Sequence, residues 1–411
     1  MSLAAGETEF VGRWTELGAA QQPEWPDAHE LARVLETIHE LPALVGIDEV
    51  DRLFAEIAAA SRGESFLLFG GDCVESFCDA RYAFVRDRVS LLAEMAQIVS
   101  GALGVPVVPI GRMAGQYAKP RTTPTETQGG IELPAFRGPA VNRAAFTLSA
   151  RTPNPRLLLV AHVKARTVLT CMRNPTMARR VATSHEALLP GFEGALARWD
   201  PRSEQWYGSS AHFLWAGERT RQLDGAHLEF LSEISNPVGC KVGPTATAEE
   251  VLAICRKLDP HRTPGRLTLI TRMGAGSIES ALPPIVSAVR DANWQVAWVC
   301  DPMHGNGLRT TSGVKTRRLD DVLAEVAAFA TVHQELGTVP AGIHLELTHE
   351  DVLECVGTAD AWADEARIDR QERYRSLCDP RLNGRQARAV AATIGRLWPG
   401  SVLPPTWNGS R

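Results

Sequence analysis

The feature that most constrains the fold of this chain is a series of short apolar segments, each of which ends in glycine or a polar residue. Short runs that are apolar throughout are typical of parallel strands whose two faces are both buried. Seven such segments are clear, at residues 66–71, 105–111, 213–217, 237–243, 267–274, 296–301 and 343–348. A weaker eighth candidate lies at residues 179–183. The pattern therefore predicts a buried parallel sheet.

Amphipathic helices lie between the later segments, at residues 248–258, 278–292 and 319–333. Alternation of strand and helix predicts an α/β protein with right-handed crossovers, and eight such units predict a (β/α)8 TIM barrel. An open doubly wound sheet is the structural alternative, but it gathers its chemistry at one or two positions. Here polar residues follow nearly every predicted strand. This favours the barrel, in which catalytic groups lie at the C-terminal ends of the strands.

Two regions depart from the regular alternation. Apolar residues recur at helical spacing over 29–40 and 47–60, which predicts that residues 1–60 form an N-terminal helical extension to a catalytic barrel at 61–411. The segment at about 120–175 is rich in proline and arginine and is too long for a simple connection. We expect it to be an insertion after the second strand, with its own helix around 155–169.

Composition excludes several classes of function. The 43 Lys and Arg residues against 48 Asp and Glu give a net charge of −5, which disfavours a protein that coats nucleic acid or an anionic membrane. No apolar stretch is long enough to span a membrane, and the first residues do not resemble a signal peptide. The eight cysteines form no CxxC pair, which favours a reducing compartment. These features predict a cytoplasmic enzyme.

Four residues form a candidate metal site. Cys73 follows the first predicted strand, His304 follows the seventh, and Glu346 lies on the eighth, so closure of a barrel would bring them together. Asp379 lies in a later loop. A thiolate, an imidazole and two carboxylates suit Mn²⁺, Fe²⁺, Co²⁺ or Zn²⁺. The alternative is that each has a structural role, as a buried thiol, a hydrogen-bonded histidine or a carboxylate paired with arginine.

Cations form a second constellation at the predicted strand ends and in the loops beyond them. They are Arg112, Lys119, Arg121, Arg219, Lys241, Arg272, Lys315 and Arg317. Several cations directed into one basin suit small, multiply anionic ligands, because arginine binds phosphate or carboxylate through two hydrogen bonds and lysine acts as a point charge. The alternative is a set of solvated surface charges, but Lys241 and Arg272 follow nearly uncharged strands.

Other motifs are weak. The sequence MGAGSIES lacks the third glycine of a dinucleotide-binding fingerprint, and no phosphate loop or nucleophile elbow is present. Ser184 and His185 are adjacent in the TSHE run, and neighbouring side chains point apart, so a catalytic triad within that run is not expected.

The motifs taken together resemble a known family. They include FGGDCVESF, PIGRMAGQYAKPRT, TSHEALL, HFLWAGERTRQLDGAHLEFL, NPVGCKVGP, LITRMG, CDPMHGN, GVKTR, GIHLELTHEDVLECVG and CDPRLN, in that order. On these motifs the chain is identified as a member of the type II 3-deoxy-D-arabino-heptulosonate 7-phosphate (DAHP) synthases. The resemblance implies a TIM barrel that condenses phosphoenolpyruvate with erythrose 4-phosphate, releasing phosphate, as the first step of the shikimate pathway and of aromatic amino acid biosynthesis.

The resemblance also implies roles for the residues named above. The metal ligands map onto Cys73, His304, Glu346 and Asp379, with Mn²⁺ or Co²⁺ favoured over Zn²⁺ or Fe²⁺. The contacts to phosphoenolpyruvate map onto Arg112, Lys119, Arg219, Lys241 and Arg272, with Glu218 beside them. Arg121 and Thr122 match the sugar-phosphate site, together with Lys315 and Arg317. Lys119 and Glu218 are the candidate catalytic residues. We also expect Cys73 and Cys378 to form a disulfide when metal is absent.

Two departures from the family pattern stand out. Pro139 replaces an aspartate of the family, and Ser277 replaces a lysine. The loss of these two charges suggests a secondary-metabolism member with an altered acceptor substrate. The N-terminal extension is shorter than in the feedback-regulated members of the family, which puts inhibition by aromatic amino acids in doubt. The alternative function is a non-catalytic barrel that binds a phosphorylated metabolite and partners with another shikimate-pathway enzyme. The amphipathic N-terminal helices suggest a homodimer or a higher homo-oligomer.

Overall fold

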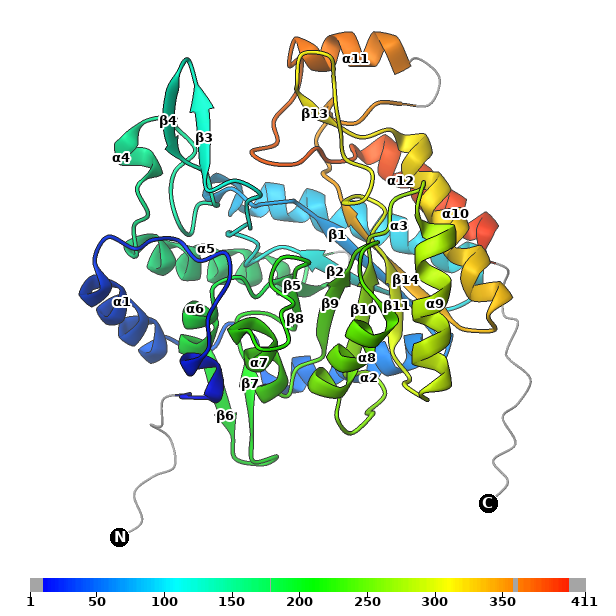
Figure 1. The fold of residues 1–411 in the computed structure, drawn as a ribbon, viewed down its shortest axis with the longest axis horizontal. Coiled ribbons are helices and arrows are strands. Elements are labelled where there is room, and N and C mark those ends of the chain that lie inside the picture. The colour runs from blue at the N-terminus through cyan, green and yellow to red at the C-terminus, as the bar shows by residue number, and fades with distance from the viewer. Residues whose placement is uncertain (1–9, 178, 358–360, 399–411) are drawn as a thin grey trace.

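The computed structural model describes residues 10–177, 179–357 and 361–398, and within them eight parallel strands close into a barrel (Figure 1). Around the barrel the order is β1, β14, β11, β10, β9, β8, β5 and β2, so each strand pairs with its neighbours in the chain. The strands are β1 Phe66–Gly71, β2 Val107–Arg112, β5 Ala182–Glu186, β8 Phe213–Ala216, β9 Val238–Val242, β10 Leu267–Thr271, β11 Ala297–Cys300 and β14 Pro340–Glu346. The predicted barrel is confirmed, and an open sheet is excluded.

The third barrel strand differs from its predicted position. It was expected at residues 179–183, and β5 instead runs from Ala182 to Glu186. The side chains of Thr183, Ser184 and His185 on this strand are buried, and each has a hydrogen-bond partner. The Thr183 hydroxyl lies 2.9 Å from His212 Nδ1, and the Ser184 hydroxyl donates to the Gly111 carbonyl over 3.1 Å. A strand with polar side chains cannot be found from apolar runs alone.

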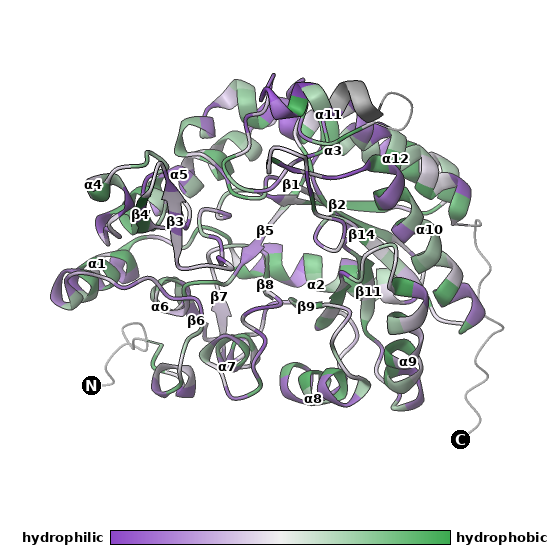
Figure 2. Ribbon diagram, turned by 45° about the horizontal axis from the view of Figure 1, so that its top comes forward, coloured by the Kyte–Doolittle hydropathy of each residue, from purple (hydrophilic) through white to green (hydrophobic). Residues whose placement is uncertain are grey.

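Most of the helices that follow β1 lie between successive barrel strands, and the last two come after the final barrel strand. They are α3 Tyr82–Leu103, α4 Leu148–Arg151, α5 Arg156–Met172, α6 Pro190–Ala195, α7 Ala226–Glu233, α8 Ala248–Leu258, α9 Ile278–Asp291, α10 Leu319–Glu335, α11 Ala361–Asp369 and α12 Gly384–Leu397. The helix α8 shows why they form. A capping box of Thr247 and Glu250 starts it, and its residues Val251, Ile254 and Leu258 are buried at helical spacing. Figure 2 shows the resulting stripes of hydrophobic and hydrophilic residues along the helices.

Two helices precede the first strand, α1 (Ala28–Glu40) and α2 (Ile47–Ser61). The helix α2 lies at the N-terminal end of the barrel, where it contacts β1, β11 and β14. Its residues Leu53, Ile57 and Ala60 are fully buried in one hydrophobic cluster with the side chains inside the barrel. The helix α1 instead packs against α5 and α6 on the outside. The N-terminal region therefore closes one end of the barrel.

Three short hairpins extend from the barrel. They are β3 (Thr125–Gln128) with β4 (Ile131–Pro134), β6 (Ala197–Asp200) with β7 (Gln205–Gly208), and β12 (Leu308–Arg309) with β13 (Lys315–Thr316). The hairpin β3–β4 and α4 occupy the first part of the segment expected to be an insertion, and α5 serves as the crossover helix from β2 to β5. Among the described residues, no helix is both long and apolar enough to span a membrane.

Candidate active site

The C-terminal ends of the barrel strands surround a cavity of about 550 Å³. Parallel strands in a closed barrel all end at the same rim, so residues far apart in the sequence face one space. Its polar lining comprises Cys73, Arg112, Gln116, Lys119, Thr122, Glu186, Glu218, Arg219, Lys241, Arg272, His304, Arg309, Lys315, Thr316, Arg317, Glu346 and Asp379. Every site residue predicted from the sequence lines this cavity except Arg121, which is paired with Glu126 at 2.5 Å.

Three of the predicted metal ligands lie close together. One ligand atom from each of Cys73, Glu346 and Asp379 lies within 4.8 Å of the others. His304 Nε2 is 3.2 Å from Glu346 Oε1, so the fourth predicted ligand borders the same cluster. The buried Glu346 Oε2 receives no hydrogen bond, although Arg317 Nη2 lies 2.8 Å away as an ion-pair partner. A carboxylate beside a thiol, an imidazole and a second carboxylate is a donor set that fits a divalent transition metal.

Asp301 orients the histidine of this cluster. His304 Nδ1 lies 2.7 Å from Asp301 Oδ2, and an ionised carboxylate can only accept, so Nδ1 carries the proton. The other oxygen, Oδ1, accepts the backbone N–H groups of Met303 and His304 at 3.0 and 3.2 Å. His304 Nε2, on the other side of the ring, is directed at Glu346 Oε1. This is the arrangement of a carboxylate that positions a metal-binding histidine.

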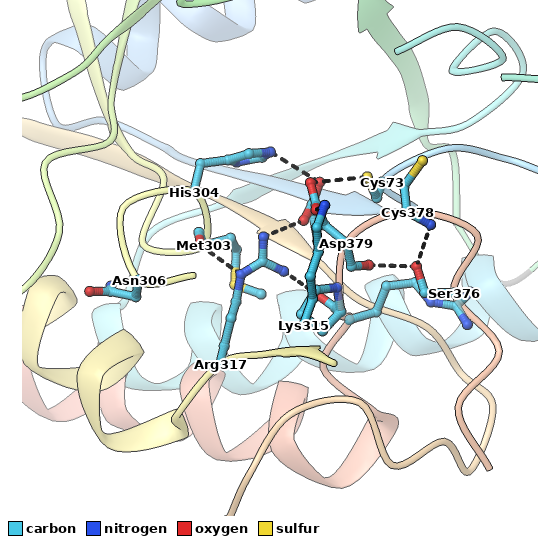
Figure 3. Close-up of polar contacts among 12 residues, drawn as sticks. Cys73, Met303, His304, Asn306, Lys315, Arg317, Ser376, Cys378 and Asp379 are labelled. Carbon is cyan, nitrogen blue, oxygen red and sulfur yellow. Dashed lines mark hydrogen bonds and ion pairs between the residues drawn. The ribbon is translucent and has the colours of Figure 1, made fainter. Parts of the chain in front are cut away.

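Cations surround the metal-ligand cluster (Figure 3). Lys315 Nζ lies 2.7 Å from Asp379 Oδ1, and the Lys119 ammonium contacts both Cys73 Sγ and Asp379. Burial opposes ionisation of Glu346, but His304 and the guanidinium of Arg317 hold the pKa of its carboxyl well below its usual range. The pKa of the Asp379 carboxyl is lowered against the effect of burial by Lys119. Both carboxylates are therefore charged at neutral pH and ready to bind a cation.

A second group of residues forms the floor of the cavity. Lys241 Nζ donates to His344 Nδ1 over 3.0 Å and contacts Asp301, and Arg112 Nη1 lies 3.3 Å from both ring nitrogens of His344. Burial, with these two cations, holds the pKa of His344 well below its usual range, so the ring is neutral and can accept. The Trp215 ring lies 5.4 Å from the Arg112 guanidinium and 5.8 Å from the Lys241 ammonium, both within cation–π range.

The buried position of Lys241 at the floor shifts the pKa of its ammonium group. Burial lowers its pKa to about 8, although the carboxylate of Asp301 opposes the shift. Arg219 Nη2 donates to the Thr122 hydroxyl over 2.8 Å, and Arg272 Nη2 donates to the His304 carbonyl over 2.8 Å. Four cations thus converge on the floor and the adjacent walls of the cavity, which suits an anion with several charged oxygens.

Glu186 and Glu218 are the two further carboxylates that line the cavity. Oε1 of Glu186 and Oε2 of Glu218 are buried and accept no hydrogen bond from any described residue. Burial raises the pKa of the Glu186 carboxyl. Glu218 is held in place by Arg221, whose Nε and Nη2 donate to its Oε1 over 3.0 and 2.9 Å.

Sequence reasoning missed Asp301, His344, Glu186 and Arg309 as site residues. Asp301 was visible as the polar residue that ends the seventh predicted strand, and Glu186 ends β5, whose predicted position was three residues too early. His344 lies within an apolar strand, where a lone histidine resembles a core residue. The signal that could have found them is a polar residue on the last turn or end of a barrel strand.

Comparisons with known proteins show the family of this chain. The chain matches the class-II DAHP synthetase family over residues 10–182 and 174–395. It is 43% identical to a phospho-2-dehydro-3-deoxyheptonate aldolase of Streptomyces coelicolor, over 97% of this chain and 98% of that protein. It is 37% identical to another protein of that name from Mycolicibacterium smegmatis, over 92% of each chain. The chain therefore belongs to the class-II DAHP synthetase family.

Proposed function

We propose that this protein condenses phosphoenolpyruvate with erythrose 4-phosphate, or a related short aldose phosphate, to give DAHP or an analogue and inorganic phosphate. The observation that carries the proposal is one cavity in which a metal-ligand cluster lies beside converging cations. Two anionic substrates repel each other, so binding both in one cavity requires such a density of positive charge. The reaction would be the first step of the shikimate pathway or of a secondary-metabolite branch.

Phosphoenolpyruvate would bind at the floor. Arg112 and Lys241 are both buried there, and Arg219 and Arg272 line the adjacent wall. The phosphate and the carboxylate of phosphoenolpyruvate offer enough oxygens to engage all four cations. Trp215 would limit access of water to the reacting carbons, because its ring covers the two buried cations.

The residues Cys73, His304, Glu346 and Asp379 would hold a divalent metal, Mn²⁺ or Co²⁺ in preference to Zn²⁺ or Fe²⁺. When bound, such an ion polarises the aldehyde oxygen of the acceptor as a Lewis acid. Lys119 already lies against two of these ligands, so its ammonium is placed to move a proton near the reacting carbons.

Two carboxylates would orient the water that adds at C2 of phosphoenolpyruvate and exchange a proton with it. Glu186 and Glu218 both line the cavity, and each has one buried carboxylate oxygen without a hydrogen-bond partner among the described residues. The raised pKa of Glu186 suits a group that accepts a proton from water and gives it up again. Glu218, which is held in place by Arg221, would help to orient the same water molecule.

A phosphate-release assay tests the proposal. Purified protein loaded with Mn²⁺ should release inorganic phosphate only when both phosphoenolpyruvate and erythrose 4-phosphate are present, with formation of DAHP. The alternative, a non-catalytic barrel that binds a phosphorylated metabolite and activates a partner enzyme, predicts binding of phosphoenolpyruvate without phosphate release. The homo-oligomeric state and the cytoplasmic location stay predictions.

Oxidation is expected to inactivate the metal-free protein reversibly through a bond between Cys73 and Cys378. Both thiols are buried in one small cluster with Val74 and Phe136. The neighbouring Cys73 thiol and the Lys119 ammonium lower the pKa of Cys378 to about 7, although burial opposes the shift, so a thiolate is available near neutral pH. Disulfide formation would remove the Cys73 ligand.

The measurement is peptide mapping after treatment of chelated protein with oxidised glutathione, with activity followed after dithiothreitol and metal are restored. The control variant is Cys171→Ser, which alters a thiol outside the cavity. Two free thiols at positions 73 and 378 in the oxidised, inactive protein would contradict the prediction.

The acceptor preference is expected to be broader than, or shifted from, erythrose 4-phosphate. Pro139 cannot supply the carboxylate of the family residue, and Ser277 cannot supply the ammonium. Neither lines the cavity, but each lies on a loop that is hydrogen bonded to a segment with residues in the cavity lining. Pro139 follows Gly138, which packs against the Tyr117 carbonyl, and the loop before Ser277 is tied to Asn306 by a 2.9 Å hydrogen bond from Ala275. Loss of one charge-assisted contact costs about 1.5–3 kcal/mol, or one to two decades in affinity.

The measurement compares kcat/KM for erythrose 4-phosphate with that for other short aldose phosphates, in the natural chain and in the double variant Pro139→Asp, Ser277→Lys. We expect the double variant to gain preference for erythrose 4-phosphate. A strong preference for erythrose 4-phosphate that is the same in both proteins would refute the shift.

A further inference from the structure

Three of the four proposed metal ligands are placed by the barrel strands, and the fourth is not. Cys73 and His304 follow β1 and β11, and Glu346 is the last residue of β14. Asp379 instead lies between α11 and α12, in the segment that comes after the last barrel strand. Its Oδ2 nevertheless lies 3.7 Å from Cys73 Sγ, although 306 positions separate the two residues in the sequence. Contacts outside the barrel strands must therefore hold Asp379 in place.

One buried carboxylate holds both ends of the loop that carries Asp379. Glu354 Oε1 accepts the backbone N–H groups of Arg375 and Ser376 over 3.1 and 2.8 Å. Glu354 Oε2 accepts the backbone N–H of Arg381 over 2.8 Å. Within the loop, the Ser376 hydroxyl donates to the Asp379 carbonyl over 2.5 Å (Figure 3). The loop is therefore closed on itself, and its two ends are fixed to one fully buried side chain.

The guanidinium of Arg381 joins this carboxylate to the segment that carries Cys73. Its Nε and Nη2 donate to Glu354 Oε2 and Oε1 over 3.0 and 2.8 Å. Its Nη1 donates to Asp72 Oδ1 over 2.7 Å. Asp72 is the residue directly before Cys73 and is only 1% exposed. One planar group therefore bonds to both segments, in a fixed fork geometry that a lysine ammonium does not reproduce.

Asp72 is also fixed by two other residues. Arg88 from α3 contacts its carboxylate, and its backbone carbonyl accepts a hydrogen bond from Arg112 Nε over 2.9 Å. The side chains of Asp72, Arg88, Arg112 and Arg381 are all buried. Buried networks of bonded polar groups make a structure rigid. Arg381 therefore connects two carboxylates that each have a defined position.

Two other cations near the ligands cannot hold the site in the same way. The ammonium groups of Lys119 and Lys315 contact the carboxylate of Asp379 itself. A metal ion would bind the same carboxylate oxygens, so both lysines must release them when the ion arrives. Arg381 instead hydrogen bonds to residues beside the ligands, so its bonds can persist while the ion is bound.

We propose that Arg381 is a positioning residue that fixes the distance between the metal ligands Cys73 and Asp379. It joins the residue before Cys73 to the carboxylate that holds the loop of Asp379. The two ligands thereby keep the spacing that one ion requires before that ion binds. Supporting contacts of this kind orient the ligands of metal sites, and their loss weakens metal binding. This inference rests on the proposed function, because it takes these residues to be metal ligands.

The first test is Arg381→Lys in the full-length protein, titrated with Co²⁺ after a chelator has removed other metal. Lysine keeps one positive charge beside the buried carboxylates, but it cannot bond to Asp72 and Glu354 with the geometry of a guanidinium. The dissociation constant for Co²⁺ should rise about 10–100-fold. The absorption band that a cysteine thiolate gives to bound Co²⁺ should also weaken at saturating metal, because Cys73 is displaced from Asp379. Neither readout depends on turnover.

Arg266→Lys is the matched control. Arg266 is also buried, and its guanidinium donates to the backbone carbonyls of Leu231, Asn236 and Leu258. It lies directly before β10, at the opposite end of the barrel from the ligands. This variant should lose thermal stability, while its dissociation constant for Co²⁺ and its Co²⁺ absorption remain those of the natural protein.

A second variant, Glu354→Gln, leaves Arg381 in place and decides the question if Arg381→Lys does not fold. Glutamine keeps the shape of the side chain but loses its charge and one of the two oxygens that hold the loop. The dissociation constant for Co²⁺ should again rise. The double variant should bind Co²⁺ more tightly than the product of the two separate losses predicts, because both residues act through one network.

An unchanged dissociation constant for Co²⁺ in folded Arg381→Lys would overturn the inference. The same result in Glu354→Gln, or an equal rise in Arg266→Lys, would also overturn it. Failure of the natural protein to bind Co²⁺ or to release phosphate from its two substrates would instead overturn the proposed function. The two failures are therefore distinguishable, because the first is a comparison among variants and the second concerns the natural protein alone.

Discussion

Replacement of His304 by alanine is expected to lower kcat by at least about a thousandfold, because Lewis-acid stabilisation contributes several kcal/mol to the transition state. The imidazole borders the Cys73, Glu346 and Asp379 cluster, and without it three ligands remain. The fold should survive, since the side chain is 23% exposed and does not belong to the hydrophobic core. Metal content after dialysis against Mn²⁺ or Co²⁺, turnover and thermal unfolding give the three readouts.

The same metal dependence should appear in the natural enzyme. Excess chelator should abolish turnover, and Mn²⁺ or Co²⁺ should restore it. His261→Ala, which removes an exposed histidine at the opposite end of the barrel, is the control and should behave as the natural enzyme does. Full activity of metal-free protein in excess chelator would show that the cluster has a structural role.

Replacement of Asp301 by asparagine is expected to lower kcat/KM by about a hundredfold or more, since loss of a carboxylate that orients a metal-binding histidine costs about 10–100-fold on its own. Asp301 also compensates the buried ammonium of Lys241. Although burial favours the neutral form of its carboxyl, His304 and Lys241 hold the Asp301 pKa well below its usual range, so it is ionised at every working pH. Asparagine keeps the shape and removes the charge.

Two readouts identify the dual role of Asp301. The dissociation constant for the metal and KM for phosphoenolpyruvate should both rise, while KM for the acceptor changes little, because Asp301 contacts His304 and Lys241 but no residue at the mouth. Asp259→Asn is a matched control, because Asp259 is also buried but lies at the opposite end of the barrel. A loss of stability with both binding constants unchanged would assign Asp301 a purely structural role.

The barrel could be predicted from the sequence because most of its strands are apolar throughout. The prediction failed to place the third strand, where Thr183, Ser184 and His185 are buried with polar partners and interrupt the apolar run. Periodicity reports which residues are apolar, and it cannot report that a polar side chain has a partner elsewhere in the chain. The same reason explains why the site residue His344, inside an apolar strand, escaped notice.

The candidate site followed from the sequence wherever a charged residue came directly after a strand. Lys241 and Arg272 are examples, since both lie at strand ends and line the cavity. Arg121 was placed in the site by resemblance, which stays a prediction; its guanidinium is paired with Glu126 from the hairpin β3–β4 and also lies 3.7 Å from Cys378 Sγ. A partner in a separate hairpin cannot be read from the local sequence.

The helix α2 is synthesised early but packs against a barrel strand that is synthesised late. This helix leaves the ribosome before any barrel strand, yet it contacts β14, the last barrel strand to be made. Leu53 and Ile57 therefore have no complete binding surface until nearly the whole chain has emerged. Contacts between such distant segments form slowly, so the apolar face of α2 stays uncovered on the nascent chain until the barrel closes.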